Sequence, residues 1–365
     1  MSQASQLELL PRVAILIPAH NEEKLISTTV GRLAAELGSR VRIMVIADNC
    51  DDQTAAIAKA SGAEVIERFD PDRRGKGYAL SFGLEHLATD PPEVVIVIDA
   101  DCRVSQGTVM ALSTQAMSTH RPAQAEYSML PPAQPGPQTM ISALALLVRN
   151  SVRVRGQTRL GFPCQLGGTG MAFPWHVIRR APATESHLVE DMLLGIALAE
   201  MGHPPLFCPE ARVESELPAR TEAGRGTRRR WEHGHLALLI NRVPRLLVRG
   251  LITCDIDLLA MTLDLAVPPL SLLVTTLLGL TLATLALGIA THVWTAAAIA
   301  TSSLTMVAAG TFLAWIRFGR KLVPLRYALC IPAYLLWKVP IYLAFAVGRR
   351  QRTWNRTERS GGPPA

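Results

Sequence analysis

The chain has 365 residues, a formal net charge of +7 and a hydrophobic content of 49%, which is high for a purely soluble enzyme. The apolar excess lies almost wholly after residue 255, and basic clusters flank the apolar segments. Because no aromatic-rich basic groove accompanies this charge, we exclude nucleic acid as the expected partner and favour an anionic lipid surface. The six cysteines lack zinc-type spacing and are expected to be reduced thiols.

Strand-like and helix-like segments alternate through the amino-terminal part of the chain. Apolar runs predict strands at 13–18, 42–47, 63–67 and 94–98, with helices between them. This alternation predicts right-handed crossovers and an α/β fold with a mostly parallel, Rossmann-like sheet. The polar segments after the first, second and fourth strands then share one edge of the sheet, where open α/β folds bind ligands.

Two acids, Asp99 and Asp101, come directly after the fourth expected strand. At the carboxyl edge of a sheet their carboxylates would repel each other unless a cation lay between them. A hard divalent metal that also binds phosphate oxygens is the usual cation. The alternative is an ordinary acidic loop after a strand.

Two later segments are candidates for binding or catalysis. Gly168-Thr169-Gly170 is a flexible backbone segment that could approach a sugar closely, or simply a glycine-rich turn before a strand. Glu190-Asp191 begins an apolar helix over 192–201 and places two acids at its positive end. These acids are either catalytic or ordinary helix-start residues.

Three apolar segments, 258–289, 294–316 and 327–347, follow in the carboxyl-terminal part. The first two exceed the roughly 20 residues needed to cross a bilayer, whereas the third contains Lys338 and two prolines. Three crossings from a cytosolic amino-terminal domain would place the basic tail outside, against the positive-inside rule. We therefore expect an even number of crossings, a third segment that is interfacial or re-entrant, and a cytosolic tail.

The chain contains an ordered set of short motifs: Pro18-Ala19-His20-Asn21-Glu22-Glu23, Asp48-Asn49-Cys50-Asp51-Asp52, Arg74-Gly75-Lys76-Gly77, Asp99-Ala100-Asp101, Gly168-Thr169-Gly170, Glu190-Asp191 and Arg230-Trp231. Together these motifs resemble the inverting family-two glycosyltransferases, especially the membrane-bound, cellulose-synthase-like branch. This resemblance implies a GT-A fold for the first domain and a nucleotide-diphosphate sugar, most often a uridine one, as the donor. It spans nearly the whole chain.

The resemblance implies how the donor is bound. Asp101 would hold Mg²⁺ or Mn²⁺, with Asp99 on the diphosphate-sugar side of the same metal site. Glu22 and Asp48 would lie around the base and ribose, and Lys76 would contact the nucleotide or its phosphates. The alternatives are helix capping for Glu22 and a solvated loop charge for Lys76. The implied donor-binding residues are Pro18, Glu22, Asp48, Lys76, Asp99 and Arg230.

The resemblance also implies the catalytic and acceptor residues. Asp191, with Glu190 beside it, resembles the base of a Thr-Glu-Asp motif whose first position is Val189 here. Arg230-Trp231 resembles the end of a Gln-x-x-Arg-Trp motif in which Thr227 replaces the glutamine, and this weakens the case for processive synthesis. The alternative is that Arg230-Trp231 belongs to an amphipathic helix that lies on lipid headgroups. The implied acceptor-binding residues are Gly168, Thr169, Gly170 and Trp231.

We therefore expect residues 1–255 to form a GT-A domain that includes an interfacial helix at about 225–250. Residues 256–348 would form transmembrane or interfacial helices, and 349–365 a basic cytosolic tail. The expected function is inverting transfer of a hexose or N-acetylhexosamine to a polysaccharide or lipid-linked sugar at the cytosolic face of the plasma or inner membrane. Other export or synthase subunits are plausible partners. The alternatives are a polyprenyl-phosphate glycosyltransferase and a catalytically silent subunit that binds nucleotide sugar.

Overall fold

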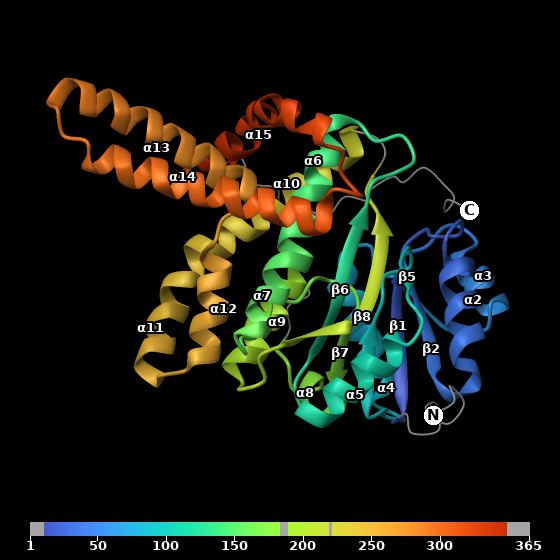
Figure 1. Cartoon of the computed structure of the whole chain (residues 1–365). Coiled ribbons are helices and arrows are strands. Elements are labelled where there is room, and N and C mark those ends of the chain that lie inside the picture. Colours follow the sequence, from blue (N-terminus) through green and yellow to red (C-terminus); the bar gives the residue numbers. More distant parts are fainter. Residues whose placement is uncertain (1–10, 183–188, 219–220, 349–365) are drawn as a thin grey trace.

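The computed structural model describes residues 11–182, 189–218 and 221–348. An α/β domain forms the larger part of the molecule, and a pair of long helices projects away from it as an arm (Figure 1). The expected basic tail at 349–365 lies outside the described residues.

One eight-stranded sheet forms the centre of the α/β domain, with the order β3-β2-β1-β4-β7-β6-β8-β5. The half that contains β3, β2, β1 and β4 is parallel, as predicted, whereas β7 is antiparallel to both β4 and β6. The α/β class is thus confirmed, with a mixed rather than wholly parallel sheet. The strands are β1 (Val13–Ala19), β2 (Arg42–Asp48), β3 (Glu64–Arg68), β4 (Val94–Val97), β5 (Arg103–Val104), β6 (Ala123–Leu130), β7 (Met171–Pro174) and β8 (Leu206–Glu216).

Helices cover both faces of this sheet. Alternate residues of β1 show the reason: Ile15 and Ile17 belong to one apolar cluster, and Leu16 belongs to the other. A strand that is apolar on both sides must be covered on both sides, which matches the continuous hydrophobic runs in the sequence. The helices of this domain are α2 (Ile26–Leu37), α3 (Thr54–Ala60), α4 (Lys76–Leu87), α5 (Thr108–Thr119), α8 (Trp175–Ile178) and α9 (Glu190–Glu200).

A continuous helical segment connects the sheet to the carboxyl-terminal helices. It begins as α6 (Pro137–Leu147), widens into the π-helix η2 (Val148–Arg153) and ends as α7 (Val154–Arg159). The η2 turn packs against β6, and α6 contacts the last helix of the chain. Because π-helical turns are rare and frequently occur at functional sites, the side chains that η2 presents are of interest.

The next three helices after β8 pack against the α/β domain. The expected interfacial helix at about 225–250 is in fact two helices, α10 (Thr221–Asn241) and α11 (Val243–Thr253). α11 pairs with α12 (Ile256–Ala266), and both contribute to an apolar cluster that includes residues of α9. The outer side of this pair is also apolar, since its exposed side chains include Val248, Leu251, Ile252, Ile256 and Leu263.

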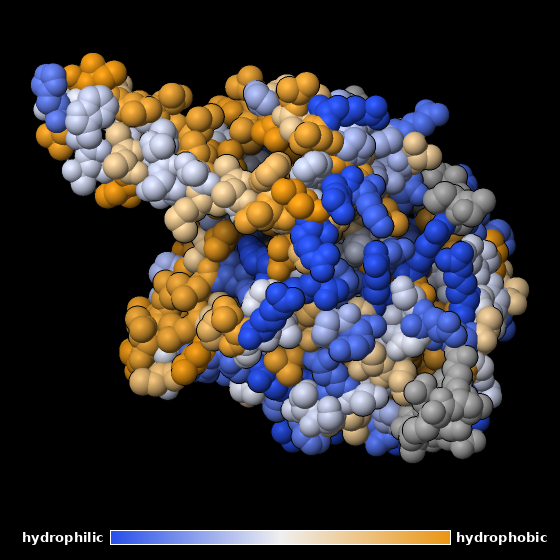
Figure 2. Space-filling view, in the orientation of Figure 1, coloured by the Kyte–Doolittle hydropathy of each residue, from blue (hydrophilic) through white to orange (hydrophobic). Residues whose placement is uncertain are grey.

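The expected apolar run at 258–289 divides at Pro268-Pro269 into α12 and α13 (Leu270–Thr291). Within the described residues, three segments are long and apolar enough to cross a membrane: Leu270–Thr291, Thr295–Gly319 and Leu325–Ala346. The first and second pair as α13 and α14 (Thr295–Ala314) to form the projecting arm, whose surface is mainly apolar (Figure 2). The second segment continues through η3 (Trp315–Gly319), and the third consists of η4 (Leu325–Cys330) and α15 (Ile331–Ala346).

The third candidate span is attached to the α/β domain by polar contacts. Lys338 of α15 is almost fully buried and forms an ion pair with Glu232 of α10. The hydroxyl groups of Tyr334 and Ser142 lie 3.1 Å apart, and Nε2 of His233 hydrogen-bonds the carbonyl of Ile341 at 2.9 Å. α15 therefore packs against α6 and α10, unlike the projecting α13–α14 pair (Figure 1).

Candidate active site

The carboxyl ends of β1, β2 and β4 meet at one edge of the sheet, as the sequence predicts. Asp48, the last residue of β2, is buried there, and its Oδ1 accepts hydrogen bonds from Arg68 Nη1 at 2.6 Å and from Asn49 Nδ2 at 3.0 Å. Arg68 is the direct neighbour of Asp48 in the parallel register of β2 and β3. The charge of Asp48 is therefore balanced within the protein, while the carboxylate still lies at the predicted edge.

Glu22 lies in the turn between β1 and α2, beside the loop that follows β2. Its backbone N–H donates to the hydroxyl of Thr54 at 2.7 Å, and its carbonyl accepts from the N–H groups of Leu25 and Ile26. These contacts join the two loops, and the preceding Asn21 has the positive φ of 56° that such a tight turn needs. Pro18 is near the end of β1, so both predicted donor residues lie at the same edge as Asp48.

Lys76 connects three of the predicted motifs. Its Nζ donates hydrogen bonds to Asp99 and to the carbonyl of Gly168. Burial lowers the pKa of Lys76, but the charges of Asp99 and of the acids at the start of α9 outweigh it, so the pKa lies above its ordinary value. Lys76 is thus a permanent positive charge at the centre of the site, rather than a solvated loop charge.

The Gly168-Thr169-Gly170 segment passes directly beside the acids. Thr169 is fully buried, and its hydroxyl accepts a hydrogen bond from the backbone N–H of Asp99 at 3.0 Å. At Gly170, which has a φ of 64°, an added Cβ would lie 2.8 Å from Val213 Cγ2. At Gly168, an added Cβ would lie 3.3 Å from Asp191 Oδ2. Glycine is required here because the backbone approaches both the core and the carboxylate closely.

Glu190 and Asp191 begin α9, as the sequence predicts. Oδ1 of Asp191 accepts a hydrogen bond from the backbone N–H of Met192 at 2.9 Å. Burial raises the pKa of Asp191, and burial together with the neighbouring charge of Asp191 raises the pKa of Glu190 to about 7. A carboxylate with a raised pKa is a stronger base than an ordinary one, which suits proton abstraction near neutrality.

Asp99, Asp101 and Cys102 form a possible metal-binding group, because one ligand atom from each lies within 4.8 Å of the others. Burial raises the pKa of the Cys102 thiol to about 12, with a further contribution from the charge of Asp99. A thiol that stays protonated is a poor metal ligand, so the two carboxylates are the chemically competent donors. Oxygen donors of this kind fit Mg²⁺ or Mn²⁺.

A cavity of about 280 Å³ lies beside Lys76 and the two acids that begin α9. Lys76, Glu190 and Asp191 provide its charged wall, and apolar side chains such as Leu16 and Phe173 provide the rest. The cavity brings residues from α4 and α9 to one space, although they are more than a hundred positions apart in the sequence.

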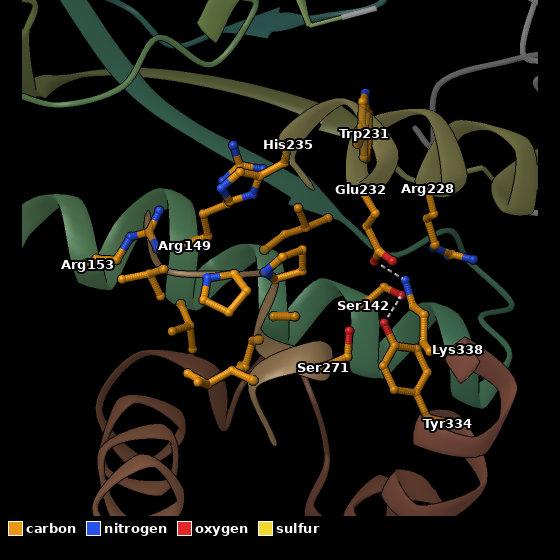
Figure 3. A pocket seen from close by; sticks show the side chains of 18 residues that line it. Ser142, Arg149, Arg153, Arg228, Trp231, Glu232, His235, Ser271, Tyr334 and Lys338 are labelled. Carbon is orange, nitrogen blue, oxygen red and sulfur yellow. Dashed lines mark hydrogen bonds and ion pairs between the residues drawn. The ribbon is translucent and has the colours of Figure 1, made fainter. Parts of the chain in front are cut away.

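Arg230 and Trp231 lie on α10, on the side of the site that faces the carboxyl-terminal helices. The positive charge of Arg230 opposes the increase in the pKa of Glu190, so the two side chains are electrostatically coupled. Trp231 instead lines a second pocket, between α10, α6 and α15 (Figure 3). Of the predicted site, the structure therefore brings Lys76, Asp99, Gly168 and Asp191 together, with Arg230 at the side and Trp231 in the adjoining pocket.

A family model described as "Glycosyltransferase like family 2" matches residues 11–234, which is more than half of the chain. The chain belongs to this family of glycosyltransferases. The predicted family resemblance is thereby confirmed.

Curated relatives of this family 2 glycosyltransferase agree with the assignment. The probable glycosyltransferase YdaM of Bacillus subtilis is 26% identical over 249 residues, which cover 62% of this chain and 56% of the relative. The 4,4'-diaponeurosporenoate glycosyltransferase of Staphylococcus haemolyticus is 26% identical over 208 residues, which cover 52% of each chain. The chain thus spans about half the length of these relatives.

A solved structure shares the fold over most of the chain. The mannosyltransferase PcManGT from Pyrobaculum calidifontis, determined in complex with GDP-Man and Mn²⁺, is 17% identical to this family 2 chain. The match covers 91% of this chain and 89% of that protein, with a TM-score of 0.55. The predicted GT-A architecture, followed by carboxyl-terminal helices, is confirmed by this likeness.

Several charged residues beside the site were not predicted for this family 2 chain. Arg68 neutralises Asp48, and Arg149 of η2 contacts Met192 Sδ at 3.6 Å, next to the predicted base. Arg228 is buried on α10, three residues before Trp231. The one available signal was the presence of two arginines, Arg149 and Arg153, at the end of an otherwise apolar helix-like segment.

Proposed function

We propose that this chain is a membrane-anchored, metal-dependent glycosyltransferase that inverts the configuration of the transferred sugar. The sugar would be a hexose or N-acetylhexosamine carried by a nucleoside diphosphate, and the acceptor a polysaccharide or a lipid-linked sugar. The observation that carries this proposal is the contact of Lys76 with both Asp99 and the Gly168 carbonyl, beside Asp191. One cation thus joins the donor-side acid to the segment next to the predicted base.

Asp191 is the proposed base. The acceptor hydroxyl would attack the anomeric carbon while the bond from that carbon to the diphosphate oxygen breaks. The electron pair of the broken bond leaves with the diphosphate, and the hydroxyl proton passes to a carboxylate oxygen of Asp191. The raised pKa of Asp191 supports this role, and the Glu190 carboxyl beside it has its pKa raised to about 7 by burial and by the charge of Asp191.

Asp99 and Asp101 would hold Mg²⁺ or Mn²⁺. When bound, such a metal supplies Lewis-acid stabilisation of the negative charge that develops on the departing diphosphate. Lys76 adds a positive charge on the same side, and Arg230 adds another from α10. The chain thereby concentrates positive charge where the leaving group becomes more negative.

The nucleoside would lie at the edge formed by Pro18, Glu22 and Asp48. A uridine diphosphate sugar is the donor that the motif pattern favours. GDP-mannose is the second candidate, because the mannosyltransferase that shares this fold was solved with GDP-Man and Mn²⁺. Gly168, Thr169 and Gly170 would then line the acceptor side, where a backbone without bulky side chains leaves room for a sugar ring.

The membrane would contact two parts of the molecule. The apolar outer side of the α11–α12 pair and the projecting α13–α14 pair lie on the same side of the α/β domain, where apolar side chains dominate the surface (Figures 1 and 2). We infer that α11 and α12 lie in the membrane interface, that α13 and α14 cross the bilayer, and that the α/β domain faces the cytosol. In this arrangement α15 remains attached to the α/β domain rather than forming an independent crossing.

The decisive experiment is a donor screen on the purified full chain with Mn²⁺ and with a chelator. Release of nucleoside diphosphate from one donor, in the presence of metal only, is the expected result. Measurable donor binding without release from any common donor would contradict the proposal and favour a catalytically silent subunit. A product on bare polyprenyl phosphate, formed equally well by the Trp231→Ala variant, would favour the polyprenyl-phosphate alternative.

A further inference from the structure

The pocket between the α/β domain and the third candidate span is unusually cationic. It has a volume of about 180 Å³, and four positively charged side chains line it: Arg149, Arg153, Arg228 and Lys338. They come from three separate elements, namely η2, α10 and α15 (Figure 3). None of these four residues belongs to the donor site described above.

Two of these four charges have carboxylate partners. Lys338 pairs with Glu232, and Arg153 pairs with Asp264 at 2.9 Å. His235, which also lines the pocket, adds no charge near neutrality because burial lowers its pKa to about 4. The other two cations, Arg149 and Arg228, form no ion pair with any side chain that the structure describes. The pocket therefore has an excess of positive charge.

Arg228 is the most informative of the four. It exposes only 6% of its surface, and neither Nη1 nor Nη2 has a hydrogen-bond partner within the described part of the chain. Its guanidinium group instead lies 5.7 Å from the centre of the Trp337 ring. Buried guanidinium nitrogens that lack hydrogen-bond partners are costly, so an anionic ligand that accepts hydrogen bonds from Nη1 and Nη2 would stabilise Arg228.

A second cavity lies immediately beside the cationic pocket. It has a volume of about 430 Å³, and its lining is almost wholly apolar, with side chains such as Leu304, Phe312 and Trp315 from the candidate spans. This volume is within the range of about 300–1,000 Å³ that is typical of ligand pockets. The two cavities share four lining residues: Ala145, Leu270, Ser271 and Tyr334.

A cationic pocket that adjoins an apolar cavity matches a ligand with one anionic end and one hydrocarbon end. The phosphate group is the anion that arginine recognises best, because the planar guanidinium group donates two parallel hydrogen bonds to it. We propose that this pair of cavities binds a phosphate-headed lipid, with the phosphate at Arg149 and Arg228 and the hydrocarbon chain among α6, α13, α14 and α15.

Arg149 connects this pocket to the catalytic carboxylate. Its positive charge partly opposes the increase in the pKa of Asp191 that burial causes. Its guanidinium group contacts Met192, the residue that follows Asp191. A lipid phosphate at Arg149 would therefore place the polar end of the molecule next to the proposed base. We assign the lipid as the carrier of the acceptor. This assignment rests on the proposed glycosyl transfer, whereas the proposed binding of the lipid does not depend on it.

The test measures binding of hexadecyl phosphate to the purified full chain in an uncharged detergent, by native mass spectrometry. One bound hexadecyl phosphate per chain is expected, with at least tenfold weaker binding of both hexadecanol and inorganic phosphate, which separates a lipid from a free phosphate. Arg228→Gln is expected to weaken binding of hexadecyl phosphate by about tenfold or more, because it removes charge-assisted hydrogen bonds. Arg245→Gln, a matched change at an exposed arginine of α11, is expected to leave it within about twofold.

A second variant tests the apolar cavity. Ala145→Phe places a ring where the two cavities meet and is expected to weaken binding of hexadecyl phosphate but not of inorganic phosphate. Donor binding with Mn²⁺ serves as the check that both variants are folded. Equal binding of hexadecyl phosphate by the wild type and by Arg228→Gln, or equal binding of hexadecanol, would overturn the inference. Release of nucleoside diphosphate is measured separately, so lipid binding without donor turnover would contradict the proposed function and the acceptor assignment while the lipid site stands.

Discussion

At the scale of single residues, the fold has shifted the pKa values of charged side chains in the site. Lys76 has a raised pKa because carboxylates surround it, and Asp191 has a raised pKa because it is buried. Asp48, in contrast, already has a close partner in Arg68. We therefore propose different chemical roles for the two acids: Asp191 accepts a proton, whereas Asp48 is a fixed hydrogen-bond acceptor at the sheet edge.

The Asp191→Asn variant tests the proposed base. The amide has the same shape as the carboxylate but cannot accept the proton, so kcat should fall by about 10²–10⁴-fold while donor binding is unchanged. Steady-state kinetics with the donor identified in the screen, together with donor titration, give both quantities. Wild-type turnover by Asp191→Asn would mean that another group is the base.

The Asp101→Asn variant affects a different step. Removing one of the two proposed metal-binding carboxylates should weaken donor binding in the presence of Mn²⁺ by about tenfold or more, because the charge-assisted contact to the metal is lost. Donor binding in the presence of a chelator should be the same for the variant and the wild type, which provides the internal control. An equal loss with and without metal would argue against a metal site at Asp101.

The pH dependence follows from the raised pKa of the Glu190–Asp191 pair. A base must be deprotonated to act. Burial raises the pKa of Asp191, and the pKa of Glu190 beside it is raised to about 7, so kcat/KM should decrease as the pH falls below about 7 instead of only in the ordinary carboxyl range. Glu190→Gln removes the neighbouring negative charge and should move this midpoint to lower pH. A profile that is flat from about pH 5 to pH 8 would contradict the raised pKa.

At the scale of elements, the segment before β7 determines how the two halves of the site meet. In this segment the carbonyl of Gly168 accepts a hydrogen bond from Lys76, and the backbone of Gly168 lies beside Asp191. Gly170 packs against the core residues Ala125 and Val213. Because β7 returns antiparallel to β4, this segment passes beside the residues that follow β4. The acids at 99 and 190–191 come together for that reason.

Gly170→Ala should destabilise the protein more than an ordinary glycine change. Its Cβ would lie 2.8 Å from Val213 and 2.9 Å from Ala125, in addition to the strain of a positive φ. Gly161→Ala is the matched control, because Gly161 also has a positive φ but has open space around its Cβ position. We expect Gly161→Ala to cost about 1 kcal/mol of unfolding free energy and Gly170→Ala about 1–3 kcal/mol more, by urea denaturation. Equal losses would mean that the clash is relieved by movement of the segment.

The first strands and helices were predictable because their signals are local. The strands at 13–18 and 42–47 were found to within one residue at their ends, since each is a buried apolar run that ends in polar residues. The pairing of Asp48 with Arg68 was not predictable, because it depends on the register of two strands rather than on any local pattern. The π-helical turn that contains Arg149 and Arg153 also has no periodic signal in the sequence. These two of the four cations in the pocket were therefore missed.

At the scale of the whole molecule, a buried ion pair is one of the polar contacts that join α15 to the α/β domain. Lys338 lies in a segment that composition alone marks as a membrane span, yet it is 1% exposed and paired with Glu232 of α10. The sequence showed an anomalous lysine but not its partner, since the two residues are 106 positions apart. The attachment of α15 thus depends on a contact that only the tertiary structure reveals.

Lys338→Met tests this attachment. The substitution leaves Glu232 as a buried carboxylate without its cation, which typically costs about 3–5 kcal/mol, so the midpoint of thermal unfolding in detergent should fall clearly. The double variant Glu232→Gln/Lys338→Met removes both charges and should recover most of the loss, because replacing a whole buried pair is often nearly neutral. Lys321→Met, at an exposed lysine near the end of the second span, controls for the loss of a basic charge and should leave the midpoint unchanged. If Lys338→Met unfolds at the wild-type temperature, the ion pair does not hold α15, and the third segment is free to cross the bilayer as we propose for α13 and α14.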